Sequence, residues 1–120
     1  MLLAVLEKGA GLRLSSYDAY LNVVGGIRIN EPALDLGVVF AVASSFKNKN
    51  LKSDVLAVGE VGLTGEIRAV SFIESRIREA EKMGFKHIII PSGNMKKLPK
   101  FEKIKVYPFD NIKDALNNFL

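Results

Sequence analysis

The longest apolar stretch of the chain covers residues 34–43 and contains one charged side chain, Asp35. Apolar residues would lie on nearly every side of a helix formed by this stretch, so the pattern predicts a central, buried helix. Asn30 is a favourable N-cap, and Pro32 suits the first turn because an N–H there has no partner within the helix. The polar run at 47–50 predicts that the helix ends in an exposed loop.

Beyond residue 50, short apolar runs alternate with stretches of helical period. Strands are expected at 55–61, 66–70, 87–90 and 104–107. A glycine-rich turn at 62–65 joins the first two, and Pro91 is expected to stop the third. This alternation predicts helices packed on strands that pair in parallel.

Two helices are expected in this second half. The first follows Ser71, which together with Glu74 has the spacing of a capping box, and Gly84 suits a left-handed C-cap. Glu74 and Arg78 are spaced for an ion pair on the surface of this helix. Asp110 is expected to cap the closing helix, whose apolar residues are Ile112, Ala115, Leu116 and Phe119.

The segment before the central helix is less regular. Residues 2–8 have the apolar stripe of a short helix, and residues 17–29 predict a strand pair or one bent strand, with antiparallel pairing. Together the elements predict one domain over residues 1–120. Its expected class is α/β (α+β), with a mixed sheet packed with helices.

Composition narrows the possible environments. The chain has 120 residues, is 48% hydrophobic and contains no cysteine. Disulfides and cysteine-ligated zinc are therefore excluded within it. No apolar run approaches the ~20 residues that span a bilayer, and the start of the chain lacks the basic lead-in of a secretory signal. We expect a cytoplasmic protein without membrane association.

Positive charge is concentrated in one region. The net charge is +4, and residues 86–105 hold six lysines against the single carboxylate of Glu102. Such a patch can attract nucleic-acid phosphates, although a solvated loop that keeps the domain soluble explains it equally well. The candidate DNA-contacting residues in this region and in a second, smaller cluster are Lys47, Lys49, Lys52, Lys96, Lys97 and Lys100.

Tests for catalytic chemistry give weak signals. Gly59, Gly62 and Gly65 lie in a strand–turn–strand segment, with no helix start directly after them to receive a phosphate. His87 is the only histidine, and a lone histidine at a strand start is more often a surface or edge residue than a base. No spacing of carboxylates indicates a metal site. No cofactor is expected in this chain.

A serine–lysine dyad is the remaining catalytic possibility, because a buried lysine can activate a serine. The serines are at positions 15, 16, 44, 45, 53, 71, 75 and 92. None lies at the amino end of the apolar helix, where backbone N–H groups could hold an oxyanion. The residues alone therefore give little support for a hydrolase.

Several segments together resemble the C-terminal domain of the RadA/Sms family of bacterial DNA-repair proteins, which is similar to the proteolytic domain of Lon-type proteases. The most specific segment is the continuous Gly59–Arg68 block. The other matching segments are residues 2–8, 10–14, 21–29, 31–32, 35–36, 43–46, 79–80, 84–86 and 90–91. The resemblance covers essentially the whole chain.

The Lon-like pattern would place the nucleophilic serine at Ala33 and the partner lysine at Glu74. Alanine carries no nucleophile, and a carboxylate cannot replace the ammonium group. The degenerate dyad therefore predicts a non-catalytic domain. The alternative is an active or latent peptidase of the serine–lysine type with a rearranged dyad.

The resemblance also implies partners and absent domains. Proteins of this family carry a zinc finger and a RecA-like ATPase that drives branch migration, and neither is expected in this chain, so ATP and zinc would belong to those domains. The Lon-like domain is expected to form a hexameric ring and to contact DNA, mainly single-stranded. A recombinase of the RecA type would be a partner of the whole protein. A purely structural ring-former remains an alternative.

Overall fold

The computed structural model describes residues 32–49, 52 and 54–120. The expected helix at 2–8, the strand or strand pair at 17–29 and the Asn30 cap lie outside the described residues. The elements, in chain order, are η2 (Pro32–Leu34), α3 (Asp35–Lys47), β1 (Val55–Ala57), β2 (Glu60–Val61), β3 (Ile67–Arg68), α4 (Ile73–Lys82), β4 (His87–Pro91), η3 (Ser92–Asn94), β5 (Lys105–Phe109) and α5 (Ile112–Phe119).

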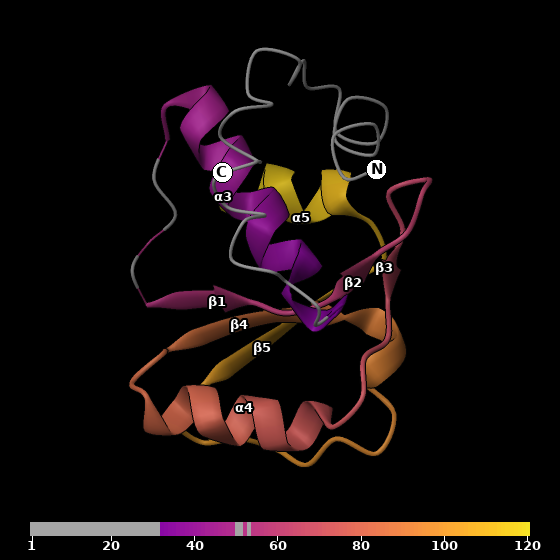
Figure 1. Cartoon of the computed structure of the whole chain (residues 1–120). Coiled ribbons are helices and arrows are strands. Elements are labelled where there is room, and N and C mark those ends of the chain that lie inside the picture. The colour runs from indigo at the N-terminus through magenta and orange to yellow at the C-terminus, as the bar shows by residue number, and fades with distance from the viewer. Residues whose placement is uncertain (1–31, 50–51, 53) are drawn as a thin grey trace.

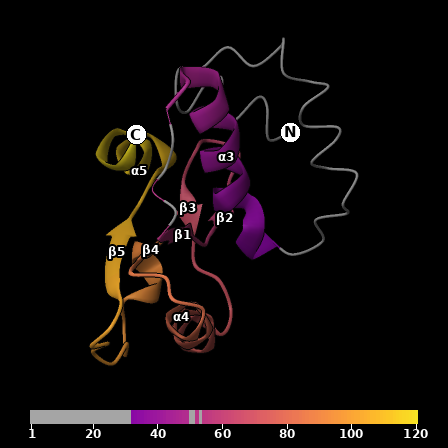
Figure 2. The ribbon, with the colours of Figure 1, turned by 90° about the vertical axis from the view of Figure 1, so that its left-hand side faces the viewer.

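Three strands form a parallel sheet in the order β1-β4-β5. Strands β2 and β3 form a separate antiparallel hairpin. Figure 1 shows α4 on one face of the parallel sheet and α3 and α5 on the other, and Figure 2 shows the same division from the side. The predicted α/β class, with parallel and antiparallel pairing, is confirmed.

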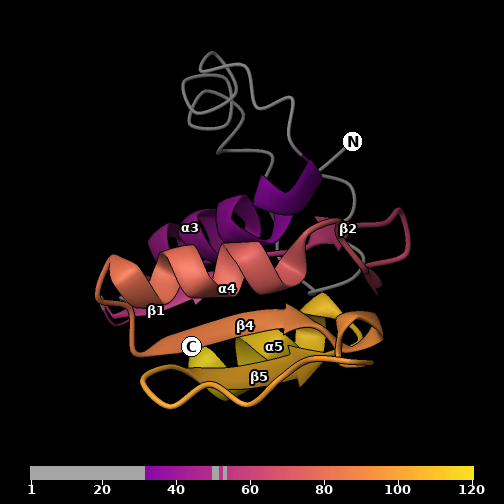
Figure 3. The ribbon, with the colours of Figure 1, turned by 90° about the horizontal axis from the view of Figure 1, so that it is seen from below.

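The central strand β4 explains this layering. Ile89 packs in the cluster formed with α3 and α5, whereas Ile88 and Ile90 pack in the cluster formed with α4. All three are completely buried because alternate side chains of a strand point to opposite faces and both faces are covered. Figure 3 shows α4 lying along the sheet over β1 and β4.

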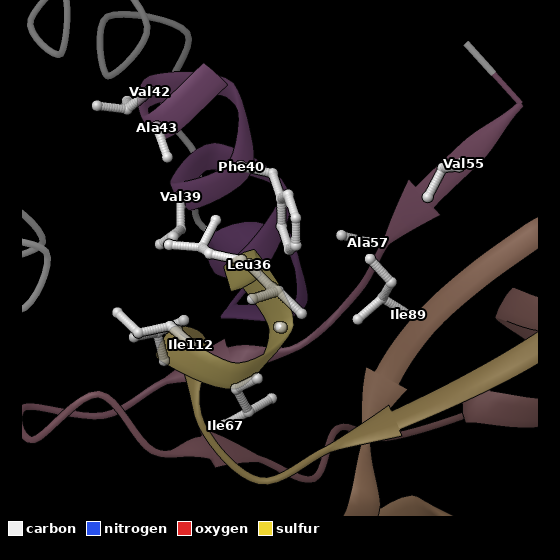
Figure 4. Close-up of a cluster of buried hydrophobic side chains, with 13 residues drawn as sticks. Leu36, Val39, Phe40, Val42, Ala43, Val55, Ala57, Ile67, Ile89 and Ile112 are labelled. Atoms are coloured by element: carbon white, nitrogen blue, oxygen red, sulfur yellow. The ribbon is translucent and has the colours of Figure 1, made fainter. Parts of the chain in front are cut away.

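Helix α3 supplies five of the thirteen buried residues of the larger core cluster, more than any other element. Leu36, Val39, Phe40 and Ala43 follow the helical repeat and are buried, and Figure 4 shows them around Ile67, Ile89 and Ile112. Ala41 on the opposite side of α3 is exposed. The prediction of a core helix is therefore confirmed for one broad face.

Helix α3 ends as its sequence indicates. Asn48 adopts a left-handed conformation with φ 51°, and the N–H groups of Asn48 and Lys49 donate to the carbonyls of Ser45 and Ser44. This is a Schellman-type end, in which asparagine takes the place usually held by glycine. The lysines that follow are exposed, as expected for the loop.

The strand expected at 55–61 is broken, and that prediction is wrong. Its first part is β1 in the parallel sheet and its last part is β2 in the hairpin. Gly59 lies at the break, where its N–H donates to Ala33 O and its carbonyl accepts from Leu36 N. These bonds to the start of α3 replace the ladder bonds that would continue one straight strand.

The expected capping box at the start of α4 is also wrong. Phe72 precedes the helix in a left-handed conformation with φ 58°, and no side chain caps the helix. An N-cap normally has extended backbone, so this turn removes the geometry that Ser71 would need. The Ser71 carbonyl instead accepts from Arg76 Nε at 2.9 Å.

The carboxyl end of α4 matches its prediction. Gly84 has φ +93°, its N–H donates to Glu81 O, and Phe85 N–H donates to Ala80 O. These bonds complete a Schellman motif, for which glycine at the left-handed position is the usual solution.

Three further boundaries differ from expectation. The cap of α5 is Asn111, whose side chain accepts from Asp114 N at 2.9 Å, and Asp110 lies one residue before it. Pro91 is the last paired residue of β4 instead of a stop before it, since it pairs with Phe109. Strand β5 continues two residues beyond 107, which is possible because it is an edge strand and tolerates Pro108.

Candidate functional site

Ala33 lies in the η2 turn that leads into α3, at the position where the Lon-like pattern has its serine. It is 1% exposed and packs in the cluster that contains Val58, Ile77 and Ala80. Its carbonyl accepts from Gly59 N–H at 2.9 Å. The methyl group is therefore a core side chain in the cluster between the sheet and α4, and this position carries no nucleophile.

Glu74 lies in the first turn of α4, at the position of the Lon-like lysine. Its carboxylate is half exposed and forms an ion pair with Arg78 Nε at 3.1 Å, one turn further along the helix. This confirms the predicted surface pair. An exposed pair of this kind contributes about 0.3–0.5 kcal/mol to helix stability, so it is a surface feature of α4.

No buried amine is present in the described part of the chain to replace the missing lysine. Each of its lysines is exposed to solvent. The Ser44 hydroxyl donates to the backbone carbonyl of Lys49, and the Ser92 hydroxyl donates to the Asp110 carboxylate. No hydroxyl within residues 32–49 and 54–120 therefore has a lysine amine as its recorded partner.

The candidate DNA-contacting lysines fall into separate places. Lys47 and Lys49 are at the end of α3, and Lys52 precedes β1. Lys96, Lys97 and Lys100 lie in the connection between η3 and β5 and are exposed. No carboxylate of the described ranges is recorded in an ion pair with these three, so their charge is available to an outside partner.

The lysines of the basic region at 86–105 lie in different elements, although Lys100 and Lys105 line one pocket. Lys86 and Lys105 lie at the amino ends of β4 and β5, where Lys105 N–H donates to Lys86 O at 2.9 Å. They are thereby placed near Lys52 at the start of β1, since Lys86 N–H donates to Asp54 O at 2.9 Å. Because the three strands are parallel, their amino ends lie together at the same end of the sheet.

Asp35 ties the start of α3 to the hairpin. Its Oδ2 accepts from Val61 N–H at 3.2 Å. Burial raises the pKa of this carboxyl above its usual value, the hydrogen bond from Val61 opposes the rise, and the nearby Glu60 carboxylate adds to it. The one charged residue of the apolar helix thus has a structural partner.

The Gly59–Arg68 block forms β2, the turn and β3. Glu66 folds back over this turn, accepting from the Thr64 N–H at 3.0 Å and the Thr64 hydroxyl at 2.7 Å, and pairing with Arg68 at 3.0 Å. The Thr64 hydroxyl bond, a backbone N–H and Arg68 lower the pKa of Glu66 to about 2. Gly62 permits this fold because a Cβ there would overlap the Glu66 carboxylate.

Sequence reasoning missed a polar group at the amino edge of the sheet. His87 is half-buried at the first position of the central strand, and its Nδ1 lies 3.1 Å from the Tyr107 hydroxyl. Its Nε2 faces the Asp54 carboxylate at 3.9 Å. His87 therefore lies in the central strand and not in an edge strand, but its side chain is 34% exposed, so the expectation of a surface position is confirmed. The sequence shows no signal for this pairing, since strand register decides it.

The described residues contain neither a metal-binding cluster nor a membrane-spanning helix. No group of three histidine, cysteine, aspartate or glutamate side chains with the geometry to hold a metal ion is found among them. Within the same residues, none of the helices combines the length and apolar character needed to cross a membrane.

The fold is an α/β domain in which helices cover both faces of a parallel sheet. Ala33 and Glu74 stand at the two positions where the Lon-like pattern predicts a serine and a lysine. A family model described as "Subunit ChlI of Mg-chelatase" matches residues 4–94, and the chain belongs to this family.

Curated relatives with the name DNA repair protein RadA match the chain along its full length. The chain is 48% identical over 120 residues to the protein of Bacillus subtilis, covering 100% of the chain and 26% of that relative. It is 47% identical over 116 residues to the protein of Halalkalibacterium halodurans, covering 97% and 25%. It is 44% identical over 116 residues to the protein of Haemophilus influenzae, covering 97% of the chain and 25% of that relative.

The chain thus spans about a quarter of the length of these relatives. The predicted similarity to DNA repair proteins named RadA is confirmed. The likeness to the Lon proteolytic domain stays a prediction from the sequence.

Proposed function

We propose that this chain is a non-catalytic domain of a RadA-type DNA repair protein, where it supports ring assembly and contacts single-stranded DNA. The observation that carries the repair assignment is the identity of about 47% over the whole chain to proteins named DNA repair protein RadA. A hexameric ring, a RecA-type recombinase as partner, and ATP and zinc in other domains of the protein belong to the same proposal.

The absence of peptidase activity is supported by the side chains at the degenerate positions. A buried methyl group at Ala33 cannot attack a carbonyl, and the Glu74 carboxylate is neutralised by Arg78 at the surface. Labelling with a fluorophosphonate and incubation with unfolded casein test this point. Neither labelling nor cleavage is expected, and labelling of any serine would favour the peptidase alternative.

DNA contact is supported by the exposed lysines of the connection between η3 and β5. Phosphate contacts from Lys96 and Lys97 would supply sequence-independent affinity through release of counterions. Phe101 is the aromatic residue next to these lysines, and Arg78 lies over its ring at 5.4 Å. This arrangement favours backbone contact over stacking of successive bases on exposed rings.

The test is the binding of a single-stranded oligonucleotide across a range of salt concentrations. Lys96→Glu combined with Lys97→Glu should weaken binding to all sequences. Loss of two phosphate contacts should reduce the salt slope by about 1.4, since each contact contributes about 0.7 for single strands.

A matched control carries Lys82→Glu with Lys113→Glu, which change the net charge equally but lie in α4 and α5. This control should bind nearly as well as the parent protein. Equal loss in both double variants would reduce the effect to net charge and contradict the proposed contact. Sedimentation with and without oligonucleotide tests ring assembly separately, and a monomer under both conditions would contradict that part.

A further inference from the structure

A pocket at the amino ends of the parallel strands includes Lys52, one of the candidate DNA-contacting lysines, but neither Lys96 nor Lys97, which the DNA-binding test changes. The amino ends of β1 and β4 lie side by side at the left of Figure 1. The pocket has a volume of about 240 Å³ and is lined by Lys52, Val55, His87, Tyr107, Asn118 and Phe119. Segments far apart in the sequence thus contribute an ammonium, an imidazole, a phenol and an amide to one cavity.

Two lysines bring positive charge to this pocket, whereas the carbonyl end of α5 and the Asp54 carboxylate oppose it. Lys52 lines the pocket, and Lys105 lies with its Nζ 5.3 Å from the centre of the Tyr107 ring. Lys49 reaches the same end of α5, where its Nζ donates to the Leu120 carbonyl at 3.1 Å. These lysines favour an anion, and the volume of about 240 Å³ admits a tetrahedral ion.

The imidazole of His87 separates the pocket from a carboxylate behind it. Its Nδ1 faces the Tyr107 hydroxyl at 3.1 Å, and its Nε2 faces Asp54 Oδ2 at 3.9 Å. The other oxygen of that carboxylate, Oδ1, is buried and has no hydrogen-bond partner within the described residues.

The protonation state of His87 decides whether the Tyr107 hydroxyl can donate a hydrogen bond to a ligand. When the ring is neutral with its proton on Nε2, facing Asp54, the Tyr107 hydroxyl donates to Nδ1 and its proton is engaged. When the ring is doubly protonated, Nδ1–H donates to the phenol oxygen. The phenol proton then turns away from the ring and becomes available to a ligand.

We propose that this pocket binds a tetrahedral oxyanion, such as inorganic phosphate or a phosphate monoester, and binds it more tightly when His87 is protonated. Lys52 and Lys105 supply charge, and the Tyr107 hydroxyl supplies the donor that depends on pH. Asn118, whose amide nitrogen donates to Asp114 O at 2.8 Å, offers its second N–H. Asp54 Oδ2 lies 3.9 Å from Nε2, and Asp54 does not line the pocket. The remaining wall, formed by Val55 and Phe119, is apolar.

Sulfate is the suitable probe for the pH dependence because its charge does not change between weakly acidic and weakly alkaline solution. His87 is the only histidine, so its ring resonances are read without assignment ambiguity. Sulfate should shift these resonances and bind about tenfold more tightly at pH about 6 than at pH about 8, because a charge-assisted donor is gained as imidazole protonates.

Three variants distinguish sulfate binding in this pocket from general attraction of anions to a positively charged protein. Tyr107→Phe keeps the ring that packs against Phe119 at 5.0 Å and should lose most of the pH dependence. Lys52→Gln should weaken sulfate binding at both pH values. Lys113→Gln, an equal loss of charge on α5, should bind sulfate as the parent protein does. Equal weakening by both lysine variants, or an unchanged pH dependence in Tyr107→Phe, would overturn the proposal.

The source of the anion is found by displacement of sulfate. Displacement by inorganic phosphate would assign the free ion, and displacement by a 5′-phosphorylated oligonucleotide at a lower concentration than its 5′-hydroxyl counterpart would assign a strand end. Displacement by none of them would overturn the proposal. The variants Lys96→Glu and Lys97→Glu should leave sulfate binding unchanged, so a failure of this pocket is distinct from a failure of the proposed DNA contact.

Discussion

The Ala33 carbonyl accepts a hydrogen bond from Gly59 N–H at 2.9 Å, and the Gly59 carbonyl accepts one from Leu36 N–H at 3.0 Å. This reciprocal pair fixes the start of α3 against the segment between β1 and β2. It also turns the Ala33 methyl into the cluster with Val58 and Ile77. The residue at the position that the Lon-like pattern gives to the nucleophile is thereby part of the packing between the sheet and α4.

Restoring the hydroxyl at this position should lower stability without creating activity. Ala33→Ser would bury a hydroxyl at a site that is 1% exposed, which costs about 1–3 kcal/mol when no partner is available. Chemical denaturation measures this change, and casein cleavage should stay absent because the described residues include no buried amine to activate the serine. Ala41→Ser on the exposed side of α3 is the control and should change stability by less than about 0.5 kcal/mol. Cleavage by Ala33→Ser would contradict the prediction that no group activates a serine here, and cleavage by the unaltered protein would contradict the non-catalytic assignment.

Gly59 should not tolerate a larger residue. A Cβ at this position would lie 2.9 Å from Ile67 Cγ2, 3.3 Å from Pro91 Cγ and 3.4 Å from Leu36 Cδ2. Gly59→Ala should therefore destabilise the protein by about 1–3 kcal/mol through overpacking. Gly93→Ala is the matched control, since its Cβ would meet its nearest neighbour, Ala69 Cβ, at an ordinary 3.5 Å. Equal midpoints of thermal unfolding for both variants would refute this prediction.

Phe72 combines a left-handed backbone, φ 58°, with a side chain that is 79% exposed. A non-glycine residue in this conformation costs roughly 1–2 kcal/mol, and an exposed ring recovers little of that through packing. Phe72→Gly should be about 1 kcal/mol more stable than Phe72→Ala, because both lose the ring and only glycine relieves the strain. Denaturant titration compares the two variants. An alanine variant of equal or greater stability would show that the turn is not strained.

Glu66 should stay ionised in acid. Thr64 and Arg68 hold its pKa near 2 in the folded protein, below the ordinary value of 4.5. A lowered folded pKa means that this carboxylate adds stability above the unfolded value and loses it as pH falls from about 4.5 towards 2. The Thr64 amide resonance, which reports the hydrogen bond at 3.0 Å, should titrate near the lower pH. A midpoint near 4.5 would contradict the bonded turn, and Glu66→Gln should remove the titration.

The sequence predicted the structure correctly where a feature depends on residues that are close together in the chain. The apolar residues 34–43 predicted a core helix, and Gly84 predicted the left-handed end of α4, because both depend on side chains within one or two turns. It failed at the start of α4, where Ser71 and Glu74 have the spacing of a cap. The left-handed turn at Phe72 overrides that spacing.

The two dyad positions could be judged from the sequence alone, because an alanine lacks a hydroxyl and a glutamate lacks an amine in any fold. The division of the basic region could not be judged in this way. Lys96, Lys97 and Lys100 stay in a connecting segment, while Lys86 and Lys105 are carried to the edge of the sheet by strand pairing. Lys86 and Lys105 are far apart in the sequence but lie close together, because they stand at the same end of two neighbouring parallel strands.

By itself, therefore, the sequence determined the class of the fold, its core helix and the similarity to DNA repair proteins, and it predicted the missing dyad chemistry. These follow from residue types and short periodic patterns. Only the tertiary structure decided that His87 meets Tyr107 and Asp54, that Gly59 breaks a predicted strand, and that Ala33 is a packing residue. Each of these depends on which backbone groups pair across long stretches of chain, and such pairing follows from the packing of the whole domain.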